Sequence, residues 1–211
     1  MKGVFDGTFQ SALDVFNYGL VLIYGLFLSV SIAGGCTEKR DKKLVALLCP
    51  VFLVLQSLFA LTLGTDKTMQ LYPLIVHLPL VLILTLALKK PLGVAVVSTC
   101  TAYLCCQLRR WVALLAVAVL SGGEVMQDTV ELIITVPVLL LLLRFAAPSV
   151  RQLSGYPART QLHFGVIPAL YYGFDYLTRV YTELLQSGDP AVVEFMPFVC
   201  CAAYLVFLLY H

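Results

Sequence analysis

The chain has 211 residues, of which 60% are hydrophobic and only 12% carry a charge. Ordinary soluble domains carry a charge on roughly 25% of their residues, so a water-soluble fold of this composition would lack the polar residues to cover its surface. We therefore predict an integral membrane protein with most of its residues in lipid. The net charge of +2 is too small to indicate binding to nucleic acid.

Seven apolar runs follow one another along the chain. Each approaches the roughly 20 residues that a helix needs to cross the hydrocarbon core, and the alternation typical of barrel strands is absent. The runs cover residues 13–34, 44–63, 71–88, 91–108, 129–145, 162–185 and 191–210. The sequence therefore predicts an all-α bundle of about seven transmembrane helices, forming a single domain over residues 1–211.

Residues 111–120 form one further apolar stretch, which has only ten residues and is too short to span a bilayer. It follows two arginines, Arg109 and Arg110, which are typical of the edge of a span. We expect this stretch to form a separate interfacial or re-entrant helix at the outer membrane surface, and the sequence leaves open that it is part of a span.

Lysines and arginines gather in three alternate loops, which by the positive-inside rule are cytoplasmic. The intervening loops are short and neutral or acidic. This asymmetry predicts an outer amino terminus and a cytoplasmic carboxyl terminus in a multi-pass membrane protein. The basic residues are Lys39, Arg40, Lys42, Lys43, Lys89, Lys90, Arg144, Arg151 and Arg159.

The chemistry-bearing residue types give no enzymatic, metal or cofactor motif. Most of the seven cysteines lie inside apolar runs, where cysteine behaves as a small hydrophobe. The adjacent pairs Cys105–Cys106 and Cys200–Cys201 are poor disulfide candidates because neighbouring residues cannot easily reach the required geometry. HExxH, G-x-S-x-G and Walker-type sequences are missing. We expect no bound cofactor or metal.

Polar residues inside the apolar runs are costly in lipid and are therefore the candidate functional residues. At a rise of 1.5 Å per residue, Arg109, Asp128 and Arg179 come out at similar depths, about 26 Å from the inner edge of the membrane. Glu131 and Asp175 come out about one turn deeper. We predict that Arg109 or Arg110, together with Arg179, pairs with Asp128 or Glu131.

Two interpretations of these charges remain open. They are either neutralised interface anchors, or they line a ligand pocket that opens to the outside together with tyrosines and a histidine near the midplane. The candidate ligand-binding residues are Arg109, Arg110, Asp128, Glu131, Tyr172, Asp175, Tyr176, Arg179 and His77.

Two segments carry a resemblance to a known family: LYPLIVHLPLVLILTLALKKPLGVAVVSTCTAYLCCQLRRWVALL in the middle and EFMPFVCCAAYLVFLLYH at the end. With the order of short loops, they resemble the amino-terminal membrane region of GHKL-type sensor histidine kinases of Gram-positive bacteria, which are related in layout to Agr-type receptors. The resemblance implies the sensing half of a two-component receptor, which detects an extracellular peptide or small molecule. In that family a cytoplasmic kinase region follows the last helix, and we expect such a continuation beyond residue 211.

A receptor of this kind implies a homodimer, for which small residues such as Gly93, Ala95 and Ser98, or Ala202 and Ala203, could allow close helix approach. The alternative is the substrate-binding membrane subunit of a vitamin-type transporter, because such subunits have a similar length and also lack catalytic residues.

Overall fold

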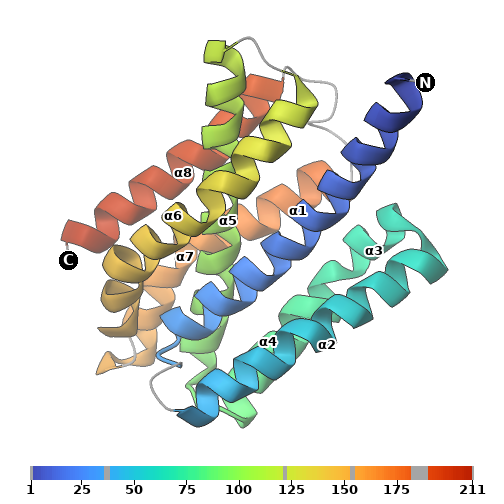
Figure 1. Ribbon diagram of the computed structural model, residues 1–211. Helices are drawn as coiled ribbons and strands as arrows, with labels where there is room; N and C mark the ends of the chain where they lie inside the picture. The colour runs from blue at the N-terminus through green and yellow to red at the C-terminus, as the bar shows by residue number, and fades with distance from the viewer. Residues whose placement is uncertain (1, 36–38, 121–122, 153–154, 182–189, 211) are drawn as a thin grey trace.

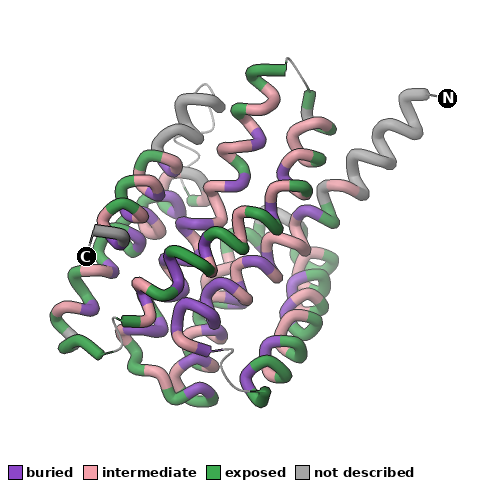
Figure 2. Tube along the Cα trace, turned by 60° about the vertical axis from the view of Figure 1, so that its left-hand side comes forward, coloured by how far each residue is buried: buried purple, intermediate pink, exposed green. Residues whose placement is uncertain are grey.

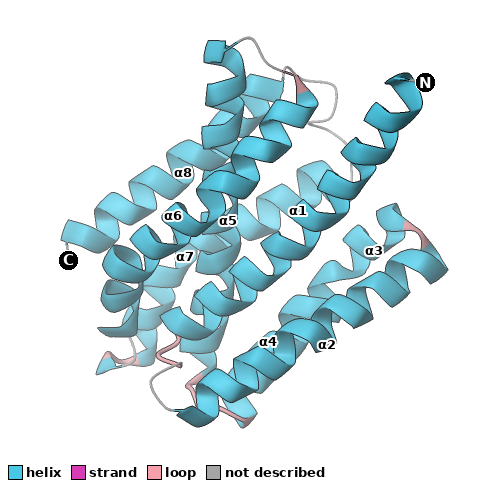
Figure 3. Cartoon of the chain, in the orientation of Figure 1, coloured by secondary structure: helices cyan, strands magenta, loops and turns pink. Residues whose placement is uncertain are grey.

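The computed structural model describes residues 2–35, 39–120, 123–152, 155–181 and 190–210, and these form helices joined by short turns, with no strand among them. Figure 3 shows the helices side by side in one bundle. The predicted all-α class is confirmed. The elements are α1 (Lys2–Ile32), α2 (Lys39–Leu63), α3 (Thr65–Tyr72), η1 (Pro73–His77), α4 (Leu78–Leu86), α5 (Leu92–Leu120), α6 (Glu124–Gln152), α7 (Ala158–Asp175), η3 (Tyr176–Tyr181) and α8 (Pro190–Tyr210).

Two of these elements, η1 and η3, are π-helical and continue directly from the α-helices beside them. In η1 the N–H of Leu78 donates to the carbonyl of Pro73, five residues earlier. Proline at residues 73 and 79 removes backbone donors, which favours such a local rearrangement. α3, η1 and α4 therefore form one helical rod whose wider turn carries His77.

α5 is a single 29-residue helix that includes residues 111–120. The prediction of a separate interfacial or re-entrant helix there is wrong. After Gly93 the segment contains neither glycine nor proline, so nothing in the backbone breaks the helix. At 1.5 Å per residue α5 is about 43 Å long, which exceeds a hydrocarbon core of about 30 Å.

Five segments in the described part of the chain are long and apolar enough to cross a membrane. They cover Val15–Ile32, Lys39–Leu63, Lys67–Leu86, Leu92–Leu120 and Val125–Gln152. In the last helix the apolar stretch is shorter and covers Pro197–Leu208. The composition and these helices together fit a membrane protein.

The basic connections gather at one end of the bundle, the lower end in Figure 1. Lys90 Nζ donates to the carbonyl of Gly34 at 3.2 Å, and Arg151 Nε donates to the carbonyl of Ser31 at 2.8 Å. These bonds tie the α4–α5 connection and the end of α6 to the end of α1. We call this the basic end of the bundle.

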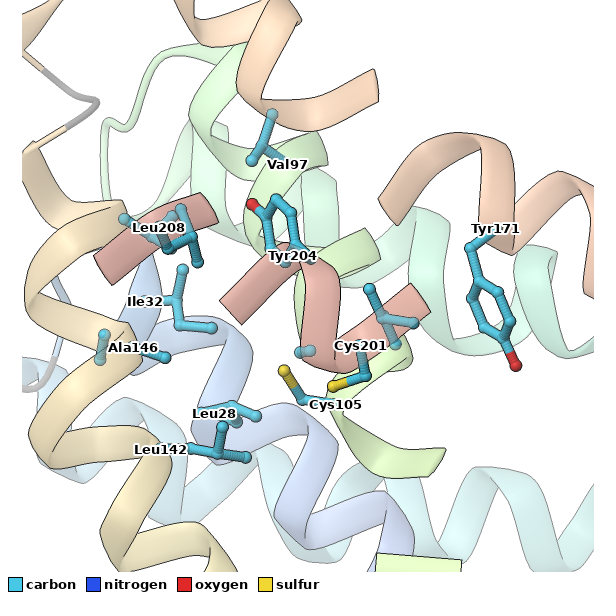
Figure 4. Packing of buried hydrophobic residues seen from close by; sticks show 14 of the residues in the cluster. Leu28, Ile32, Val97, Cys105, Leu142, Ala146, Tyr171, Cys201, Tyr204 and Leu208 are labelled. Atoms are coloured by element: carbon cyan, nitrogen blue, oxygen red, sulfur yellow. The ribbon is translucent and has the colours of Figure 1, made fainter. Parts of the chain in front are cut away.

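The core consists of two buried clusters that share α1 and α5, and Figure 2 shows the buried residues concentrated on the inward sides of the helices. One cluster joins α1 and α5 to α6 and α8. In Figure 4, Leu28 and Ile32 of α1 lie close to Leu142 and Ala146 of α6, with Tyr204 of α8 nearby. The other cluster joins α1 and α5 to α2 and α4. Both clusters depend on the same two helices, which therefore form the centre of the bundle.

Glycines bring α5 and α7 close together. A Cβ atom on Gly165 of α7 would collide with Val97 Cγ2 of α5, and a Cβ atom on Gly93 of α5 would lie 2.8 Å from Gln161 Oε1 of α7. Ala95 and Ser98 are fully buried. The small residues that could have supported a dimer through α5 are thus used for packing inside the chain, whereas Ala203 of α8 remains exposed.

Gly165→Ala is expected to destabilise the bundle by about 1–3 kcal/mol, because the added methyl group overpacks against the branched side chain of Val97. Gly173→Ala in the same helix is the control, since a Cβ atom there meets nothing within 4 Å. That change should be neutral or stabilising by up to about 1 kcal/mol. Unfolding in mixed micelles measures both, and equal effects would contradict the close α5–α7 contact.

Candidate functional site

Arg109 is the centre of a buried polar network between α1, α5 and α6. Its Nη2 lies 3.3 Å from Glu131 Oε2, and its Nη1 donates to Asn17 Oδ1 at 2.9 Å and to Thr135 Oγ1 at 3.4 Å. Arg109 and Glu131 are each only 5% exposed. A buried ion pair is tolerated where further hydrogen bonds support both groups. In this network both Nη atoms of Arg109 have partners, while Nε has no partner among the described residues.

Asn17 extends this network, which we call the Arg109 network, to a second carboxylate. Its Nδ2 lies 3.3 Å from both Asp128 Oδ1 and Glu131 Oε2 and donates to them. Of the alternative pairings that the sequence leaves open, Arg109 with Glu131 is present in the structure. Arg110, the next residue, is exposed. The Arg109 network is thus a neutralising structural link between three helices.

A second polar group surrounds His77, on the other side of α5. Its ring lies within 6.5 Å, between ring centroids, of the rings of Tyr72, Tyr103, Tyr172 and Tyr176. The planes meet at 67–85°, the edge-to-face arrangement that aromatic rings prefer. Nδ1 of His77 and the hydroxyl of Tyr172 form a hydrogen bond of 2.8 Å. We call these five residues the tyrosine cluster.

Asp175 is buried and contacts this cluster through Tyr103. Its carboxylate accepts hydrogen bonds from the hydroxyls of Tyr103 and Tyr171. The hydroxyl of Tyr181 donates to the carbonyl of Gln70 at 2.9 Å and so attaches η3 to α3. The tyrosine cluster is therefore held by bonds from α5, α7 and both π-helical segments.

A cavity of about 190 Å³ adjoins the tyrosine cluster, between α1, the α3–η1–α4 rod, α5 and η3. On α1 its lining residues recur at intervals of three and four, which places them on one face of the helix. They are Tyr18, Val21, Leu22, Gly25, Leu26 and Ser29. This stripe spans the twelve residues from Tyr18 to Ser29, so the cavity extends about 16 Å along the bundle.

α5 contributes a matching stripe to the cavity: Thr99, Ala102, Tyr103, Cys106 and Gln107. Ser29 Oγ and Thr99 Oγ1 hydrogen-bond at 3.3 Å, at the end of the cavity nearest the basic end of the bundle. Gly25 and Ala102 have little or no side chain. Space therefore remains between α1 and α5 along the middle of the cavity.

The structure separates the predicted site residues into two groups. His77 and Tyr176 line the cavity, and Tyr172 and Asp175 contact the residues that do so. Arg109, Asp128 and Glu131 lie in the Arg109 network instead, and Arg110 is exposed. The side chain of Arg179 lies outside the described residues, so its predicted pairing stays a prediction.

The sequence prediction missed three tyrosines and a glutamine that line the cavity, because it searched for charged residues at matching depth. These are Tyr18, Tyr72, Tyr103 and Gln107. A signal was present in the two stripes of polar and small residues at helical spacing on α1 and α5. Such stripes become informative only when the helices that face each other are known.

Comparison with protein-family models, curated proteins and solved structures found no match to this chain. The interpretation of the cavity consequently depends on its own geometry.

Proposed function

We propose that this chain is a membrane-embedded sensor that binds a small molecule from outside the cell in the cavity beside the tyrosine cluster. The observation that carries the proposal is the cavity itself, in which polar aromatic side chains converge inside an otherwise apolar bundle. A largely apolar cavity with a few converging polar groups is the usual form of a small-molecule site.

The position of α5 supports a sensing role. Its residues Thr99, Tyr103 and Gln107 face the cavity. On other faces, Thr101 Oγ1 hydrogen-bonds to the hydroxyl of Tyr204 at 3.2 Å, and Trp111 stacks on Phe198 at 3.6 Å between ring centroids. Both partners belong to α8, the carboxyl-terminal helix. A ligand that shifts α5 would therefore act directly on the last helix.

The proposal includes a place in a two-component system, as the sensor region of a GHKL-type histidine kinase acting as a homodimer. Its support is the resemblance in loop order and the contact between α5 and α8. The resemblance implies that the last helix carries the output, and the contacts between α5 and α8 support this part of the proposal.

A panel of three small molecules tests the binding function: phenol, 1-hexanol and choline, which represent aromatic, aliphatic and cationic ligands. Protein in lipid nanodiscs is heated with each. At saturation at least one should raise the unfolding temperature by a few degrees. Ala102→Phe, which fills the cavity, should remove that shift. Shifts of the same size in both proteins, or no shift with any compound, would contradict the proposal.

The proposed topology has seven crossings, with the basic end cytoplasmic and the amino terminus outside. In a variant without the native cysteines, Lys42→Cys and Tyr156→Cys at the basic end should resist an impermeant thiol reagent added to intact cells. Gly123→Cys at the opposite end should react. All three positions are exposed, so access through the membrane decides the result. Labelling of residue 42 from outside would contradict the orientation.

A further inference from the structure

The size of the cavity restricts its ligand to a small molecule. Its volume of about 190 Å³ slightly exceeds the roughly 150 Å³ of an engineered apolar cavity that holds benzene. One or two fused rings, or a chain of similar volume, would fill it.

The lining of the cavity disfavours a charged ligand. Within the part of the chain that the structure describes, no Asp, Glu, Lys or Arg side chain lines it. The carboxylate of Asp175 hydrogen-bonds to a lining residue, Tyr103, and accepts hydrogen bonds from the hydroxyls of Tyr103 and Tyr171. Moving an ion out of water without a counter-charge is costly, so an uncharged ligand is favoured over a small anion or an ammonium ion.

The walls of the cavity favour a flat ring. One wall carries the rings of Tyr72, His77, Tyr103 and Tyr176, and these rings already contact one another. The lining also includes Gly25 of α1 and Ala102 of α5, whose small size leaves space beside these rings. A slot with rings along one side suits another aromatic ring, which can stack or meet them edge to face.

Several polar groups at the cavity have no protein partner. Nδ1 of His77 is engaged by Tyr172, which leaves Nε2, and no residue in the described ranges bonds to that nitrogen. Among the same residues, the hydroxyl of Tyr176 and the amide of Gln107 also lack hydrogen-bond partners. Tyr176 is 93% buried, since its exposed fraction is 7%. Among the described residues the fully buried side-chain atoms without a partner are Gln56 Oε1, Ser98 Oγ and Arg109 Nε. The polar atoms of His77 and Tyr176 are therefore not enclosed by protein, and both residues line the cavity, where a ligand could bond to them.

We propose that the cavity binds an uncharged, planar aromatic molecule of one or two fused rings that carries a hydrogen-bonding group, with Tyr176 and His77 as its polar contacts. This inference rests on the proposed function, because it names the ligand class of the same cavity. It gives the tyrosine cluster a second role, as a recognition wall as well as a packing unit.

Two matched pairs of probes test the ligand class. Phenol and cyclohexanol share size and hydroxyl group but differ in flatness. Quinoline and N-methylquinolinium share the same fused rings, but the second carries a positive charge and an added methyl group and has no free lone pair on nitrogen. Binding to the full chain in nanodiscs is measured by calorimetry, and the signal of Ala102→Phe is subtracted to remove partitioning into lipid. We expect phenol and quinoline to bind at least tenfold more tightly than their partners.

Tyr176→Phe tests the polar contact, because it removes a hydroxyl that has no partner in the described protein. It should weaken phenol binding about tenfold, which corresponds to about 1.4 kcal/mol, without lowering the unfolding temperature of the empty protein. Tyr171→Phe is the control, since that hydroxyl bonds to Asp175 and does not line the cavity. It should leave phenol binding within about twofold.

The outcomes separate this inference from the proposed function. Tighter binding of N-methylquinolinium than of quinoline, or equal binding of cyclohexanol and phenol, would overturn the inference and leave a ligand-binding cavity of another class. Equal effects of Tyr176→Phe and Tyr171→Phe would also overturn the assigned contact. If no probe distinguishes the parent chain from Ala102→Phe, both the inference and the proposed function are wrong.

Discussion

Arg109→Ala is expected to destabilise the folded bundle by about 3–5 kcal/mol, the usual result of removing one partner of a buried ion pair. The change leaves the carboxylate of Glu131 buried with only amide donors, from Asn17 and Gln127. Asn17 Oδ1 also loses its donor. Typical hydrogen bonds between membrane helices contribute much less, about 0.6 kcal/mol, so the stranded charge should dominate. Unfolding of the purified protein in mixed micelles measures the difference.

Arg110→Ala is the matched control, because the neighbouring arginine is exposed and exposed ion pairs contribute at most about 1 kcal/mol. The double change Arg109→Met with Glu131→Met removes both charges at similar volume and should recover most of the lost stability. Equal losses for the two single arginine variants would show that the Arg109 network is not a buried neutral link. If the double variant does not recover stability, the stability lost in Arg109→Ala comes from packing and not from the stranded charge.

Ligand binding in the cavity is expected to change the fluorescence emission of Trp111. In the Ala102→Phe variant, whose cavity is filled, the same ligand should leave the emission unchanged. Trp111 is the only tryptophan in the chain, and its ring stacks on Phe198 of α8 at an interplanar angle of 14°. Because α5 carries both this ring and the cavity stripe, movement of α5 should alter the stack. Emission is measured during titration with the probe that gives the largest thermal shift.

This emission measurement distinguishes a sensor from a transport subunit. A sensor must couple the occupied site to an output element, and α8 is the carboxyl-terminal element of this chain. A probe that raises the unfolding temperature but leaves Trp111 emission unchanged would mean that the cavity binds without coupling to α8. The transporter interpretation would then be favoured.

The helical class and the positions of the long helices could be predicted because each apolar run is a local property of the sequence. Residue counting restricts the partner of Arg109 to Asp128 or Glu131, which lie within about one turn of its depth, but it does not choose Glu131 over Asp128. The end of α5 could not be predicted in this way. Two adjacent arginines indicate a membrane edge only when neither is neutralised inside the bundle, and Glu131 neutralises Arg109.

The cavity was harder to predict because it depends on which helix faces which. Of the charged residues that were predicted to line a pocket, Arg109, Asp128 and Glu131 lie in the Arg109 network. The described lining of the cavity consists of uncharged side chains, mainly from α1, α5 and the π-helical segments. The π turn at Pro73–His77 changes which residues of that rod share a face. A regular 3.6-residue period cannot reveal such a change.

Photo-crosslinking tests the central claim, that the cavity beside the tyrosine cluster is the ligand site. A phenol that carries a diazirine group is bound to the protein in nanodiscs, irradiated, and located by peptide mapping. The account predicts adducts on Tyr18, Gly25 and Leu26 of α1 and on Ala102 and Tyr103 of α5, with unlabelled phenol competing. Adducts confined to the shallow apolar groove on α2 at Val51, Val54 and Leu58, or adducts unaffected by Ala102→Phe, would contradict it.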